Sequence, residues 1–169
     1  MESTPYDFGP VARLDAESQG PPGQRTFRLL VTSDQGTASL WLEKEDLQTL
    51  GLAIEQFLAQ LSGRPQWKLY GAPPAPYQPP RGFPLKPLVE LKVGQLSIGY
   101  EDTSGLFVLL IHDVDADPDG PASFTCLASS SQLEALSRRI ESIIAAGRPR
   151  CPLCGDPMDR DRHACIRSN

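Results

Sequence analysis

Three cysteines and one histidine lie close together near the end of the 169-residue chain, within the stretch CPLCGDPMDRDRHAC (residues 151–165). Cys151 and Cys154 are three positions apart and are followed by a glycine, which is the pattern of a zinc knuckle. His163 and Cys165 supply two further donors. Three thiolates and one imidazole favour tetrahedral Zn²⁺ over hard cations. The spacing C-x2-C-x8-H-x-C therefore predicts a compact zinc site in the C-terminal tail.

This predicted zinc is expected to be structural. Four protein ligands leave no open position for water or substrate, which a catalytic zinc requires. No H-E-x-x-H motif occurs, and residues 151–165 contain no glutamate that could act as a base. A redox-active C-x-x-C and a chance cluster are the alternatives. A redox pair of the thioredoxin type begins a helix after a strand, whereas Cys151 follows the Arg-Pro that leaves a predicted helix.

Other residues that could do chemistry form weaker patterns. Within residues 112–120, HDVDADPDG, the pattern Asp115-x-Asp117-x-Asp119-Gly120 resembles the opening of a calcium loop. The twelfth position counted from Asp115, which needs a glutamate, is Cys126. A solvated acidic hairpin is expected there instead, with Cys126 in the core. His112 beside Asp113 could be half of an acid–base pair, although a structural histidine is commoner at a strand end. The sequence indicates no catalytic residue and no P-loop.

Two amphipathic helices are predicted over residues 42–63 and 130–147, where apolar residues recur at steps of three and four. Ser131 and Glu134 are expected to form a capping box at the start of the second helix. A shift of 86 residues superposes the two helices. The residues expected on the buried faces are Leu47, Leu50, Ile54, Phe57, Leu58 and Leu61 in the first helix and Leu133, Leu136, Ile140, Ile143 and Ile144 in the second.

Alternating apolar and polar residues predict strands before each helix. The expected strands cover residues 27–32, 37–42, 89–93, 95–100, 106–114 and 122–128. The predicted fold is therefore α+β: an antiparallel sheet from two similar strand-rich halves, each ending in a helix that packs on one face. Duplication and a chance likeness of two strand–helix pairs both explain the repeat. The expected organisation is an α+β body over residues 1–148, with halves at about 5–63 and 88–148, a connection at 64–87 and a zinc-knuckle tail at 149–169.

The connection is rich in proline, with eight prolines between residues 65 and 87. It contains Pro76-x-x-Pro79-x-Arg81, a pattern that some peptide-binding domains recognise in polyproline helices. The alternative, which we favour, is a stiff connection that lies over the sheet. Its aromatic residues are then expected to fix it in place: Trp67, Tyr70, Tyr77 and Phe83.

The charge of the chain is unevenly distributed. The net charge is −5, and from Arg148 onward five arginines and three aspartates give +2, so the preceding body carries −5 − 2 = −7. An acidic body is a poor general binder of nucleic acid. No signal peptide or membrane span is apparent, so a cytoplasmic location with reduced thiols and no membrane partner is expected.

Several motifs together resemble an uncharacterised bacterial family known as domain of unknown function 3090. These motifs are GPPGQRTF, LEKEDLQTL and AGRPRCPLCGDPMDRDRHACIRSN, in that order along nearly the whole chain. Ile166 departs from the family pattern, where proline is usual. The resemblance supports the fold and the zinc site and implies no particular activity. The signature positions are Gly20, Gly23, Arg25, Thr26, Phe27, Leu42, Glu43, Lys44, Gly147, Arg148, Pro149, Cys151, Cys154, His163, Cys165, Arg167 and Asn169.

Three functions remain open on this basis. The preferred hypothesis is a non-enzymatic module that binds another protein. Its possible interaction surface consists of Arg25, Glu43, Lys44, Arg148, Arg160, Arg162 and Arg167. A nucleic-acid binder that uses the basic knuckle is the second hypothesis, although no aromatic residue for base stacking follows residue 124. The third is an enzyme with a cleft between the halves, in which Arg25, Glu43, Lys44 and His112 would converge.

Overall fold

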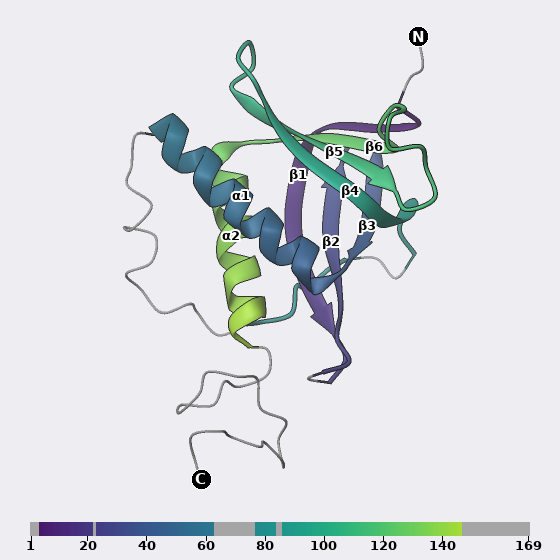
Figure 1. Ribbon diagram of the computed structural model, residues 1–169, viewed down its shortest axis with the longest axis vertical. Helices are drawn as coiled ribbons and strands as arrows, with labels where there is room; N and C mark the ends of the chain where they lie inside the picture. Colours follow the sequence, from purple (N-terminus) through teal and green to yellow (C-terminus); the bar gives the residue numbers. More distant parts are fainter. Residues whose placement is uncertain (1–3, 22, 63–76, 84–85, 147–169) are drawn as a thin grey trace.

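The computed structural model describes residues 4–21, 23–62, 77–83 and 86–146, and these residues form six strands and two helices (Figure 1). The order of elements, three strands followed by a helix, occurs twice. The elements are β1 (Tyr6–Gln19), β2 (Thr26–Ser33), β3 (Gly36–Leu42), α1 (Lys44–Ser62), β4 (Val89–Glu101), β5 (Leu106–Asp113), β6 (Phe124–Ala128) and α2 (Ser130–Ala145).

The six strands close into a barrel in the order β1-β2-β3-β4-β5-β6. Pairs within each half are antiparallel, but β3 with β4 and β6 with β1 are parallel. The α+β class is therefore confirmed, whereas the prediction of a wholly antiparallel sheet is wrong. A parallel pair needs a long crossover, and α1 together with the connection provides one between β3 and β4.

The first strand of each half bends so that it pairs on both sides. In β1, residues 6–10 pair with β6 and residues 11–19 pair with β2. In the same way, residues 89–92 of β4 pair with β3 and residues 93–101 pair with β5. The register of β4 shifts at Gly94, where a Cβ atom would lie 2.7 Å from the Cα of Val114. Only glycine fits this bend, and the bend allows the sheet to close.

Both helices lie on the same side of the barrel and pack against each other (Figure 1). Their apolar faces join the inward side chains of the strands in one core. The equivalent positions that the 86-residue shift predicts are buried in both helices: Leu47 and Leu133, Leu50 and Leu136, Ile54 and Ile140. Cys126 is buried in the core as expected, with 1% of its surface exposed.

Two details of the helices differ from the predictions. Leu61, expected on the buried face, is 51% exposed, because it lies in the last turn of α1 beyond the part that packs on the core. The capping box of α2 is formed by Ser129 and Gln132 instead of Ser131 and Glu134. Ser129 has the extended backbone that a cap requires, whereas Ser131 already lies inside the helix.

The part of the chain that the structure describes contains two helices, α1 and α2. Neither is long and apolar enough to cross a membrane.

Candidate functional site

A glycine of α1 lies against α2 in the contact between the two helices. Gly51 lies in the middle of α1, and a Cβ atom at this position would be 3.0 Å from Cγ2 of Ile140 on α2. Most side chains at residue 51 would separate the helices, so the missing side chain permits the close approach. The residues that flank this contact determine what the surface between the helices can bind.

A groove of about 260 Å³ lies along this contact, on the outer surface of the helix pair. Its lining is mainly apolar, and Leu52 on its edge is 48% exposed. Because α1 ends the first half of the fold and α2 ends the second, the groove lies between the halves. The lining residues are Gln48, Gly51, Leu52 and Glu55 from α1 and Ser137, Ile140, Glu141, Ile144 and Ala145 from α2.

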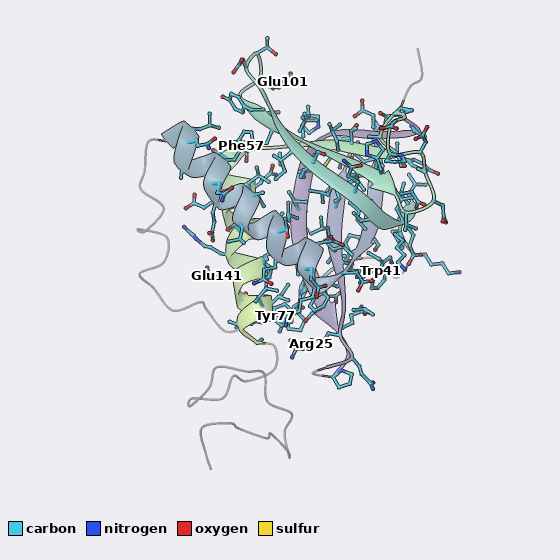
Figure 2. All side chains as sticks on the ribbon, in the orientation of Figure 1. Arg25, Trp41, Phe57, Tyr77, Glu101 and Glu141 are labelled. Carbon is cyan, nitrogen blue, oxygen red and sulfur yellow. The ribbon has the colours of Figure 1, made fainter. Side chains whose placement is uncertain are left out.

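Two carboxylates, one from each helix, line this apolar groove: Glu55 and Glu141, the latter labelled in Figure 2. Burial raises the pKa of Glu141, the negative charge of Glu55 raises it further, and Arg138 lowers it. The Ser137 hydroxyl donates a hydrogen bond of 3.4 Å to Oε1 of Glu55. Neither carboxylate belongs to an ion pair among the described residues, since Arg138 pairs with Glu134. Among the described residues, the two carboxylates of the groove therefore have no salt-bridge partner.

A second groove, of about 350 Å³, lies between α1 and β4. Its polar lining includes Asp46, Thr49 and Gln95, and its apolar lining includes Phe57 and Ile98. It also joins the two halves, but among its lining residues Asp46 is the one titratable group. The helix–helix groove has a titratable group from each helix, Glu55 and Glu141, so we regard it as the better candidate site.

The end of the proline-rich connection is bound to the outside of the barrel. The backbone N–H of Ser18 donates to the Tyr77 hydroxyl at 3.0 Å, and Arg13 donates to the carbonyl of Arg81 at 2.6 Å. Arg139 of α2 donates to the carbonyl of Gln78. The stiff connection over the sheet is confirmed for this part, whereas Trp67, Tyr70 and Pro76 lie outside the described residues.

Arg28 is the centre of the contacts beneath this connection. It lies opposite Glu17 of β1 and Trp41 of β3 in the sheet register. Its Nε is 2.6 Å from Oε2 of Glu17, and its Nη1 donates a hydrogen bond of 2.9 Å to Oγ of the fully buried Ser39. Its guanidinium also lies 5.3 Å from the centre of the Trp41 ring and 5.4 Å from that of the Phe83 ring. These partners occupy the guanidinium, so Arg28 fixes the connection and is not available to a ligand.

The residues proposed for an enzymatic cleft do not converge. Arg25 follows the turn between β1 and β2, at the opposite end of the barrel from Glu101 (Figure 2). Its Nε and Nη1 are buried, and no described residue forms a hydrogen bond with them. Glu43 and Lys44 are exposed at the beginning of α1. The ring Nε2 of His112 lies 3.1 Å from the Gly120 carbonyl oxygen, which indicates a structural role. None of these four side chains lines either groove.

The predicted metal ligands Cys151, Cys154, His163 and Cys165 lie outside the described residues, as do the interaction candidates Arg148, Arg160, Arg162 and Arg167. Within the described ranges, no three His, Cys, Asp or Glu side chains are placed to hold a metal ion. In the acidic loop after β5, Asp113 and Asp117 instead accept hydrogen bonds from the backbone two residues onward. Burial raises the pKa of the Cys126 thiol to about 12, with a smaller contribution from Asp7, so this thiol is unreactive.

The fold is an α+β barrel in which one order of elements occurs twice, and its helix pair presents an apolar groove with two carboxylates. The chain belongs to the family described as protein of unknown function (DUF3090), whose model matches residues 6–165. The match covers all the strands and helices described above and the four predicted zinc ligands. No curated protein and no solved structure matches the chain.

Proposed function

We propose that this chain is a non-enzymatic, cytoplasmic module that binds another protein, with a structural zinc site in its C-terminal tail. The observation that carries the proposal is the groove between α1 and α2, which is mainly apolar and open to solvent. It is lined by two carboxylates that form no salt bridge with any described residue. The groove offers apolar side chains from both helices, which a side chain of a partner protein would cover. The scattered positions of Arg25, Glu43, Lys44 and His112 give no comparable support to an enzyme.

The zinc site adds a second element to the module. Cys151, Cys154, His163 and Cys165 form a donor set that suits Zn²⁺ and fills its coordination shell. In the sequence, the tail follows directly after α2, which ends at Ala145. The tail carries a net charge of +2 from Arg148 onward, which makes it a docking element for an acidic partner surface.

Affinity purification of the tagged full-length chain from its own cells tests this proposal. The comparison includes Leu52→Glu in the groove, a chain that lacks residues 149–169, and Leu88→Glu as a control. Leu88 is 66% exposed and lies outside both grooves. We expect a partner that the wild type and Leu88→Glu retain and that Leu52→Glu loses. Identical sets of bound proteins for Leu52→Glu, the truncated chain and the wild type would contradict the proposal.

A further inference from the structure

The helix–helix groove has the size and chemistry for one long cationic side chain. Small-molecule sites usually have volumes of about 300–1,000 Å³, so a groove of about 260 Å³ is small for a free metabolite. It is suited to a side chain that a partner inserts while the rest of the partner lies on the helices. Leu52, Ile140 and Ile144 offer apolar contacts to the methylene groups of such a side chain.

The charges in the groove determine which end group this side chain carries. Glu55 faces the groove from α1 and Glu141 from α2, with Gln48 and Ser137 as neutral polar neighbours. Arg138 is the nearby cation, but its guanidinium pairs with Glu134 at 2.6 Å. A positive end group between Glu55 and Glu141 would remove the repulsion between the two carboxylates, whereas a neutral or acidic group would leave it.

We propose that the groove between α1 and α2 binds an arginine side chain that a partner protein presents. This inference rests on the proposed function and specifies its partner. A guanidinium is favoured over an ammonium because it is more weakly hydrated and can form planar hydrogen bonds with two carboxylates at once. The raised pKa of Glu141 fits this assignment, because a cation beside the carboxylate would lower the pKa again.

A pair of matched peptides tests the inference on the full-length chain. Acetyl-Leu-Arg-Leu-amide is compared with the same peptide in which citrulline, a neutral side chain of equal shape, replaces arginine. Binding is followed by the backbone amide signals of Gly51, Ser137 and Ala145 in ¹⁵N NMR spectra. We expect the arginine peptide to move these signals with a Kd of about 1 mM and the citrulline peptide to bind at least about 10-fold more weakly.

Two glutamine substitutions give the control within the protein. In the double variant Glu55→Gln, Glu141→Gln the arginine and citrulline peptides should bind equally. The arginine peptide should also lower the pKa of Glu141 in the wild type, as read from its side-chain carboxyl signal. Equal binding of the two peptides to the wild type, or no change at these amides with about 10 mM arginine peptide, would overturn the inference.

A failure of the arginine inference can be distinguished from a failure of the proposed function. If Leu52→Glu releases a partner while the wild type binds both peptides equally, the groove is a docking site but does not recognise arginine.

Discussion

The contacts of Arg28 allow a sharp prediction about stability. Substitution Arg28→Met keeps the length and most of the packing of the side chain but removes its charge. Glu17 then loses its ion-pair partner, and the fully buried Ser39 loses the hydrogen bond to its Oγ. The connection also loses the guanidinium that lies against the Phe83 ring.

The expected cost follows from the first two of these losses, the ion pair with Glu17 and the hydrogen bond to Ser39. Both side chains of the Arg28–Glu17 pair are 15% exposed, so the loss of one partner should cost about 2 kcal/mol, less than the 3–5 kcal/mol typical of a fully buried pair. The lost hydrogen bond to Ser39 adds about 1 kcal/mol. A total near 3 kcal/mol corresponds to a decrease in Tm of about 6–12 °C for a chain of this length.

Thermal and urea unfolding followed by circular dichroism measure this effect. The matched control is Arg138→Met, because Arg138 also pairs with a glutamate at 2.6 Å but is 72% exposed. We expect the control to lose no more than about 0.5 kcal/mol. Equal effects of the two substitutions would refute the reasoning that burial determines the strength of the pair. Adding Glu17→Gln to Arg28→Met should cost little more than Arg28→Met alone, since the two residues act as one unit.

Three further predictions concern the core, the groove and the thiols. Leu40→Ala should lose about 2–5 kcal/mol in urea unfolding because Leu40 is fully buried, whereas Leu88→Ala, at 66% exposure, should change stability by less than about 0.5 kcal/mol. The pKa of Glu141 is raised in the folded chain, so folding is favoured when this carboxyl group is protonated. The stability that it contributes is complete below its ordinary pKa of 4.5 and is lost as the pH rises through the raised pKa. The substitution Glu141→Gln should flatten this pH dependence of the unfolding free energy. Treatment of the native, zinc-loaded chain with a thiol reagent should leave all cysteines unmodified, and removal of zinc by a chelator should expose three of them. Only denaturation should expose Cys126. Reaction of Cys126 before denaturation would contradict its burial.

The helices and most strands could be predicted from the sequence because their side-chain periods are regular. The steps of three and four in α1 and α2 place on the core the same residues that the structure buries or packs against it. Phe57, Leu58 and Ile144 are partly buried, and Leu61 is the exposed exception. By contrast, β1 was not predicted, because Gly9 and Pro10 interrupt its pattern. The alternation of Arg13, Asp15 and Glu17 with buried Leu14 and Ala16 was the available signal.

The direction of the strands and the groove depend on contacts between distant residues. Periodicity distinguishes a strand from a helix but does not determine whether β4 runs parallel or antiparallel to β3. The long crossover through α1 was a usable sign of a parallel pair. The groove could not be found in this way, since Glu55 and Glu141 are 86 residues apart in the sequence (141 − 55). They line one groove because α1 and α2 pack against each other. The same shift of 86 residues relates the two helices, so equivalent glutamates face each other.

Photo-crosslinking in living cells tests most directly whether the helix pair is a docking surface. A diazirine analogue of leucine is placed at Leu52, which is 48% exposed in the groove, or at Leu88, which is 66% exposed outside it. We predict that position 52 crosslinks to one protein, that position 88 does not, and that Glu55→Gln together with Glu141→Gln abolishes the adduct. The absence of any adduct from position 52, or the same adducts from both positions, would contradict the account.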